Sequence, residues 1–473
     1  MAKSLFRKLA KQITLDNKIL IKAFILGALI RGIAEIVVGK YPIGYDPNTW
    51  YIYMCVCNNL RLMLLGILYP LMLQLMYLLF GNAIIAVKLC SVLVSGLFLF
   101  SLVFWGVANN IDYDVALDFG IAMYSFYVIL RIIWDLHRNV VGLCISLIAL
   151  AYYKRGAFKK AFFLGILAGL AHPFDAIFIG AALFMDIIRK NFRALSIVIG
   201  TTLAVLLLGV LNSILTEFPN PISIALKSNS SYVSKEMLPI YIIWLYFPVL
   251  PLLLNVKHNF VNYIKRNFRK RIINSFSLWI ITILIAAFIF NFSYRIVFLA
   301  AFPIMFVVFN RIHRSYGRKA VKYLILYNII VAIVYPLIFY IYPINPAFRR
   351  THPPVLLAGN MFPHETYAAE RLFRKAYSLL NNSSVIIVHH SEIAYAYGAG
   401  IPLCSSQVII TGPDDTFDEY LELLSENLTY HFAYIVWYVN ALVGSCKAPT
   451  GGQILEREGN IALFRYDLSI WKL

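Results

Sequence analysis

Apolar stretches recur along most of residues 19–342, and each one ends at a short polar or basic break. A helix needs about 20 mainly apolar residues to cross the hydrocarbon core of a bilayer. The pattern therefore predicts about eleven membrane helices, some of them short. Their expected ranges are 19–38, 83–107, 115–133, 140–153, 161–171, 176–188, 195–215, 238–254, 276–290, 296–309 and 321–342.

A further apolar run, residues 60–80, is interrupted by Arg61, Pro70 and Gln74. If this run spans the membrane, the downstream basic loops fall on the side opposite the basic N-terminus. If it lies along the outer face or re-enters it, they all fall on one side. We adopt the second interpretation because lysine and arginine collect in cytoplasmic loops, and the first outer loop is then 39–82.

The pattern changes near residue 343, where apolar runs shorten and Gly, Pro, Asp and Glu return. Helices are expected at 365–380 and 417–426, and strands at 385–389, 408–411, 432–438 and 461–466. Such alternation is typical of an α/β layer. The expected fold class is an all-α multi-spanning membrane bundle in 1–342, followed by a small α/β domain in 343–473.

Composition supports this class, since 60% of the residues are hydrophobic and only 14% are charged, with a mean hydropathy of +0.73. Soluble domains carry about 25% charged residues. The formal net charge of +19 does not indicate a nucleic-acid partner, because the basic residues lie in loops between apolar runs. The basic N-terminal segment is too long for a cleaved signal peptide, so we expect the first run to remain as an anchor.

The chosen topology places the N-terminus in the cytoplasm and the C-terminal domain outside the cell membrane. This topology also places the Asn-x-Ser/Thr triplets, the acceptor sites of N-glycosylation, on the outer side of the membrane. They begin at Asn229, Asn291, Asn381, Asn382 and Asn427. The six cysteines predict no disulfide framework, and Cys55 and Cys57 lack a second pair for a zinc site. We assign no metal, and interpret this cysteine pair and His389-His390 as structural.

Polar residues gather at the expected outer face, where a charge near the hydrocarbon usually has a partner or a task. They come from the stretches "GYDPNTWYIY", "WDLHRN", "AHPFDA" and "FNFSYR". The candidate site residues are Tyr45, Asp46, Trp50, Trp134, Asp135, His137, Arg138, His172, Asp175, Tyr294 and Arg295.

This set suits sugar transfer from a lipid phosphate. A carboxylate takes the proton from a hydroxyl that attacks a sugar, while arginines hold the departing phosphate. We expect Asp46 as the general base, with Asp135 or His137 orienting it. Arg138 and Arg295 are expected on the phosphate, and the remaining candidates are expected to bind substrate, the aromatic ones through their apolar faces and polar tips.

Each candidate also has a structural interpretation, and these alternatives stay open. Asp46 before Pro47 suits a helix cap. Asp135 and Arg138 suit an i,i+3 pair on a solvated turn. His172-Pro173 suits the end of a helix, and Arg295 suits an interfacial anchor.

The stretch 44–53 resembles the Gly-x-Asp-Pro-aromatic element in the first outer loop of oligosaccharyltransferase catalytic subunits. "WDLHRN" and "NFSYRIVFLAAFP" add to a likeness to the glycosyltransferase C superfamily, whose enzymes use polyprenyl-phosphate-linked sugars. The resemblance implies that Asp46 is catalytic or metal-binding, that Asp135 belongs to a second acidic motif, and that Arg295 contacts the lipid phosphate.

Two departures limit what this resemblance implies. The tail lacks the Trp-Trp-Asp triplet of oligosaccharyltransferases, and neither Asp46 nor Asp135 has a second acid two residues on. We therefore expect transfer of one sugar from a polyprenyl (dolichyl) phosphate to a hydroxyl of a glycan, lipid or protein. No cofactor is expected. The alternative is that two acidic residues from separate segments share one Mg²⁺ or Mn²⁺ ion.

Two other functions remain open. A transporter or flippase of lipid-linked glycans often carries ionisable residues near the bilayer midplane, and Arg31 and Glu35 form a possible buried pair in the first span. A non-catalytic membrane subunit would use the tail as a binding module.

Overall fold

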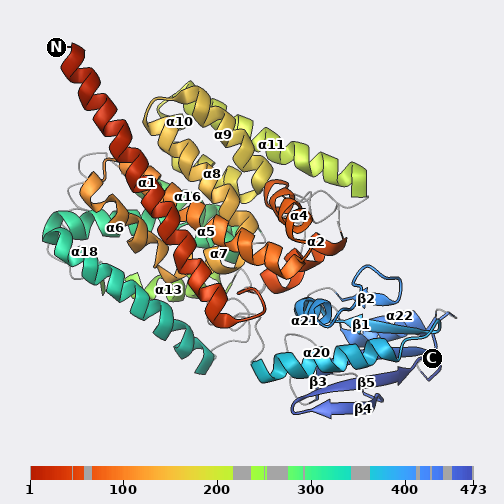
Figure 1. The fold of residues 1–473 in the computed structure, drawn as a ribbon. Helices are drawn as coiled ribbons and strands as arrows, with labels where there is room; N and C mark the ends of the chain where they lie inside the picture. The colour runs from red at the N-terminus through yellow and green to blue at the C-terminus, as the bar shows by residue number, and fades with distance from the viewer. Residues whose placement is uncertain are drawn as a thin grey trace. The chain divides into compact units, whose positions relative to one another are not determined.

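The computed structural model describes residues 2–44, 46–57, 66–216, 236–249, 251–252, 275–290, 293–341, 363–411, 416–426, 429–439 and 450–470. The chain divides into two compact units. The first joins Met1–Ala34, Leu60–Met72 and Leu89–Val355, and the second joins Glu35–Asn59, Leu73–Lys88 and Leu356–Leu473. The expected fold class is confirmed, with a helical bundle and a small C-terminal sheet domain (Figure 1).

The first unit is built from long apolar helices, and each predicted range contains one that is described. They are α1 (Ala2–Val38), α5 (Ala83–Ala108), α6 (Tyr113–Tyr124), α7 (Tyr127–Asp135), α8 (His137–Lys154), α9 (Phe158–Ala171), α10 (Phe174–Ile188), α11 (Phe192–Thr216), α13 (Leu238–Tyr246), α16 (Ser275–Ile289), α17 (Ser293–Phe298) and α18 (Ala301–Ile341).

By length and apolar composition, three of the described helices are suited to cross a membrane by themselves. They are Ala83–Ala108, Phe192–Leu215 and Arg295–Val334. Helix α4 (Leu68–Phe80) has only 13 residues, which is too short to cross a core of about 30 Å.

The range 115–133 does not form one straight helix, because α6 and α7 meet at an angle of 74°. Phe126 between them is extended, with ψ of 123°. The buried Asn328 donates from Nδ2 to the carbonyl of Ala122 at 2.8 Å. A carbonyl at the end of a helix needs such a partner where water is absent, so the bend is supported by a side chain far away in the sequence.

Helix α18 also breaks, at Gly317, whose φ of +71° lies in the left-handed region that glycine tolerates. This position falls in the basic loop 311–319 that the sequence places between two spans. Arg318 next to the break pairs with Asp118 of α6 through Nε and Oδ2 at 2.9 Å.

The second unit contains a five-stranded sheet of order β2-β1-β3-β5-β4. The strands are β1 (Ser384–Val388), β2 (Val408–Ile410), β3 (Phe432–Tyr438), β4 (Gln453–Glu458) and β5 (Ile461–Asp467). The first three are parallel, and β5 and β4 extend the sheet in antiparallel fashion. Helices α20 (Pro363–Ser378), α21 (Ile393–Gly398) and α22 (Phe417–Ser425) complete the domain (Figure 1).

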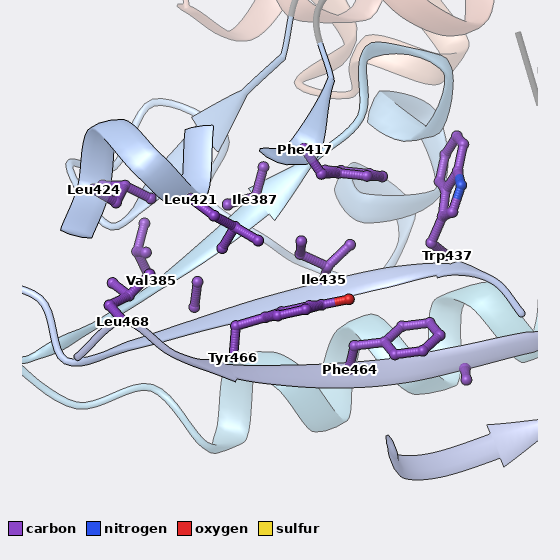
Figure 2. Close-up of a cluster of buried hydrophobic side chains, with 12 residues drawn as sticks. Val385, Ile387, Phe417, Leu421, Leu424, Ile435, Trp437, Phe464, Tyr466 and Leu468 are labelled. Carbon is purple, nitrogen blue, oxygen red and sulfur yellow. The ribbon is translucent and has the colours of Figure 1, made fainter. Parts of the chain in front are cut away.

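The core lies between the sheet and α22, where residues of alternate strand positions meet Leu421 and Leu424 (Figure 2). Trp437 and Phe417 lie at one end of this core, with ring centroids 5.2 Å apart. The prediction missed β4, because its sequence "QILERE" is mostly exposed and charged. Such a strand is typical of a sheet edge, and its sequence lacks the alternation of buried and exposed residues that identifies an inner strand.

Candidate functional site

The segment Glu35–Asn59, which begins the predicted first loop, belongs to the same compact unit as the C-terminal domain. The buried carboxylate of Glu370 on α20 accepts from Lys40 Nζ at 2.8 Å, from Tyr41 Oη at 2.6 Å and from Arg374 Nη2 at 3.0 Å. Hydrogen bonds to a charged group are stronger than neutral ones. They fix the start of the loop to the domain across some 330 residues of sequence.

Changing Tyr41 to Phe removes one of these donors and keeps the ring contact with Tyr395 at 4.7 Å. The Glu370 carboxylate then retains its two charged donors, so we expect a loss of stability of about 1.5 to 3 kcal/mol. A thermal unfolding curve of the purified protein measures it. An unchanged Tm would contradict the role of this contact, and Tyr316→Phe, on an exposed ring of α18, serves as the control.

A disulfide between Cys57 and Cys404 joins the end of α2 (Ile52–Cys57) to the segment after α21. The sequence analysis predicted no such bond, and that prediction is wrong. The two cysteines are 347 residues apart, so their spacing contains no signal. Cys55, Cys90 and Cys144 are free and buried.

Asp46 directly precedes η1 (Pro47–Tyr51), a single π-helical turn, and its residue is 8% exposed. Its side chain makes no capping hydrogen bond to the helix, so the capping interpretation is not supported. Asn48 instead stabilises the turn, donating from Nδ2 to the carbonyls of Pro42 at 2.6 Å and Gly44 at 2.9 Å. Tyr45 lies outside the described residues.

Trp50, at the end of η1, is half-buried and stacks on His390 of the C-terminal domain, with centroids 5.9 Å apart and planes at 12°. His389 packs on Trp437 at 4.5 Å and accepts at Nδ1 from the amide of Ser391. Asp46 and Trp50 therefore lie on a short helical segment that contacts the carboxyl end of β1.

Arg31 and Glu35, the possible pair of the first predicted span, are both buried and make further contacts. Glu35 accepts from the amide of Ile43 at 3.2 Å and pairs with Lys88 at 3.8 Å. Arg31 belongs to the first unit, where it donates to the carbonyl of Trp134 at 3.3 Å and lies 4.9 Å from the centre of its ring.

In the first unit, the break between α7 and α8 positions Trp134, His137 and Arg138. Leu136 interrupts the helix with φ of −99° and ψ of 56°. His137 is fully buried, and its Nδ1 lies 3.0 Å from the hydroxyl of Tyr69 and 3.4 Å from that of Ser91. The side chain of Asp135 lies outside the described residues, although its backbone ends α7.

The break between α9 and α10 lies against α8, because Gly142 of α8 leaves room for the side chains of His172 and Asp175. His172 accepts at Nδ1 from the amide of Phe174 at 3.2 Å, which fits a role in ending the helix. Asp175 accepts from Ser146 Oγ at 2.7 Å and is 1% exposed. Helix α8 at Gly142 and the segment 172–175 thus lie side by side.

Arg295 follows Tyr294 on α17, and the side chain of Tyr294 is outside the described part. Desolvation, and then the charges of Arg138 and Arg295, lower the pKa of His172 below its ordinary value. Both guanidinium groups therefore act on the same imidazole. The first unit brings Arg138, His172 and Arg295 into one electrostatic environment.

Among the described residues, no group of three or more His, Cys, Asp or Glu side chains has the arrangement of a metal site. Sequence reasoning also missed Glu370 and Glu392, both of which are buried in the C-terminal domain. Glu370 lies on the amphipathic helix α20 among charged neighbours, so its sequence does not distinguish it from an exposed acid.

No protein-family model matches the chain, and no curated protein matches it either. Solved structures do. The crystal structures of ArnT from Cupriavidus metallidurans, one in the apo state and one bound to undecaprenyl phosphate, each align with a TM-score of 0.55 at 14% identity. Each alignment covers 93% of this chain and 97% of ArnT.

The chain therefore shares the fold of ArnT. The alignment includes both the bundle and the C-terminal domain, since it leaves out only a small part of either chain. With this fold and its apolar helices, the chain has the architecture of a multi-pass membrane protein.

Proposed function

We propose that the protein is an integral membrane glycosyltransferase that moves a sugar from a polyprenyl phosphate to a hydroxyl of a glycan, lipid or protein acceptor. The observation that carries this proposal is the likeness, over 93% of the chain, to a protein solved with undecaprenyl phosphate bound. Asp46, which precedes η1, and Arg138 and Arg295 of the bundle are residues of the types that such a reaction needs.

In the proposed reaction, the acceptor hydroxyl oxygen attacks the anomeric carbon, and the bond from that carbon to the phosphate oxygen breaks. Asp46 takes the hydroxyl proton, and the polyprenyl phosphate leaves with both electrons of the broken bond. Arg138 and Arg295 stabilise the phosphate charge. His137, held by Tyr69 and Ser91, fixes the α7–α8 junction that carries Trp134, Asp135 and Arg138.

We further propose that the first loop and the C-terminal domain lie outside the cell membrane, with the N-terminus in the cytoplasm. The Cys57–Cys404 bond supports this orientation, because disulfides persist in oxidising compartments and are rare in the cytosol. We propose that transfer needs no metal, since Asp46 and Asp135 each lack a neighbouring acid.

The test uses the purified protein in liposomes with polyprenyl-phosphate donors that carry a radiolabelled sugar, in parallel with and without EDTA. We expect label to move to acceptors from a membrane extract while free polyprenyl phosphate accumulates. Label that crosses the bilayer on an unchanged lipid would instead establish a flippase. Activity that EDTA removes and Mg²⁺ or Mn²⁺ restores would contradict metal independence.

Arg138→Gln and Arg295→Gln should each weaken binding of polyprenyl phosphate about 10-fold to 100-fold, because a hydrogen bond to a charged group contributes about 1.5 to 3 kcal/mol. The measurement is the rise in Tm when undecaprenyl phosphate is added. Arg318→Gln, whose guanidinium pairs with Asp118, is the control and should keep the full rise. Equal affinity in all three variants would exclude these arginines from the phosphate site.

A further inference from the structure

The carboxyl ends of β2, β1 and β3 meet at one edge of the sheet. In the register, Val388 lies opposite Ile410 and Ile387 opposite Ile435. Thr411, His389 and Trp437 therefore follow as a row across the three strands. The chain leaves β1 toward β2 on one side and returns to β3 on the other. Ligands of open α/β sheets bind at this type of topological switch point.

Polar atoms without partners gather at this edge. Both carboxyl oxygens of Glu392, the hydroxyl of Thr411 and the indole nitrogen of Trp437 are buried and have no hydrogen-bond partner among the described residues. Their residues are 1%, 0% and 0% exposed. Buried polar groups in native proteins are nearly always satisfied, so unpaired ones at one edge point to a ligand.

Aromatic side chains also lie at this edge of the sheet. Trp50 stacks on His390, which lies two residues before Glu392. Tyr438, half-buried at the end of β3, has its pKa raised by burial and then by the nearby carboxylates of Glu365 and Glu392. The edge thus combines hydrogen-bonding groups with aromatic faces.

We propose that this edge binds the glycan portion of the acceptor, as a neutral polyhydroxyl ligand. This inference rests on the proposed function and extends it, since it assigns a place to the acceptor. Sugar hydroxyls both donate and accept, as the carboxyl of Glu392, the hydroxyl of Thr411 and the indole of Trp437 require. Phosphate is a poorer fit, because the Glu365 carboxylate near Tyr438 repels it.

The Trp50 ring lies against His390, close in the chain to Glu392. In the proposed complex, the Trp50 side chain turns away from His390 and stacks on the sugar. Trp50 is only four residues from Asp46, so the bound acceptor lies close to the proposed base along the same helical turn.

Glu392 also predicts a pH dependence, because burial raises its pKa well above 4.5. Between the unfolded pKa and the higher folded pKa, only the folded state keeps the proton, so stability falls as pH rises through that window. Glu392→Gln removes this dependence. We expect its Tm to exceed that of the wild type increasingly as pH rises above 4.5, and parallel Tm curves would contradict the burial of an unpaired acid.

The decisive experiment combines ligand binding with stability. Saturation-transfer NMR on the full-length protein in nanodiscs uses methyl glycosides and short oligosaccharides of mannose, glucose and galactose as probes. Glu392→Met and Thr411→Val remove the unpaired groups at nearly constant volume. We expect them to weaken binding roughly tenfold or more while Tm stays the same or rises.

Ser384→Ala is the matched control in the same domain. The buried Ser384 hydroxyl accepts from the amide of Asn381 at 2.8 Å, so its loss should lower Tm and leave binding unchanged. The proposal is overturned if the wild type binds none of the probes at millimolar concentration, or if Glu392→Met and Thr411→Val bind them as well as the wild type. A fall in Tm like that of Ser384→Ala would also overturn it, since bound water would then satisfy these groups.

The experiment contains no donor lipid, so its result is independent of sugar transfer. Failure of binding leaves the transferase proposal intact. Binding by a protein that does not transfer sugar would instead retain the edge as a glycan site and reject Asp46 as a base.

Discussion

The Asp46→Asn protein is expected to insert into the membrane and fold normally. Its rate of sugar transfer should fall by about 100-fold to 10,000-fold, which is the contribution that a general base makes to a rate. The side chain of Asp46 makes no capping hydrogen bond, and Asn48 stabilises the adjoining turn. An amide of nearly the same shape therefore preserves the loop and cannot accept the proton. The measurements are the rate of label transfer and the Tm of the same preparation.

Asp112→Asn is a suitable control, because Asp112 is exposed and makes no side-chain cap before α6. It should retain both full activity and wild-type Tm. Product formation by Asp46→Asn at the wild-type rate would reject the general-base role, whereas a large fall in its Tm would show that Asp46 is structural.

Cys57→Ser is expected to reduce stability by about 2 to 5 kcal/mol, as loss of a native disulfide does in small secreted domains. The bond closes a loop of more than 300 residues, and it joins α2 to the C-terminal domain. Cys404→Ser should have the same effect, and the double variant should be no worse. Thermal unfolding with and without a reductant measures the change.

Cys55→Ala is the matched control, because Cys55 lies on the same helix and is free. Reductant should lower the Tm of this variant as it does that of the wild type. In intact cells, a membrane-impermeant maleimide should label Cys57 only after reduction. Labelling without reduction would show that the bond is absent, and failure to label after reduction would place the loop in the cytoplasm.

The helix positions were predictable from the sequence, because a continuous apolar segment is one that is buried in lipid or in protein. The C-terminal strands were predictable for the same reason, as "SVIIV" in β1 shows. The bend at Phe126 was not, since its support comes from Asn328 on a distant helix. A straight helix and a bent helix can have the same apolar sequence pattern.

The candidate residues were identified from short local motifs. Such motifs contain no information about tertiary contacts between distant segments. The contacts of Glu370 with Lys40 and Tyr41 join residues about 330 positions apart. Burial of Glu392 likewise depends on packing around the strand ends. The capping alternative for Asp46 followed from local chemistry, and the side-chain geometry does not support it.

The long span between the bonded cysteines has a consequence for biosynthesis. At elongation rates of about 5 to 20 residues per second, Cys404 follows Cys57 by roughly 17 to 70 s. During that interval the thiol of Cys57 has no partner and can react with oxidants or with its neighbour Cys55. Correct pairing therefore waits for the synthesis of Cys404, and efficient production in a foreign host should depend on its thiol isomerases.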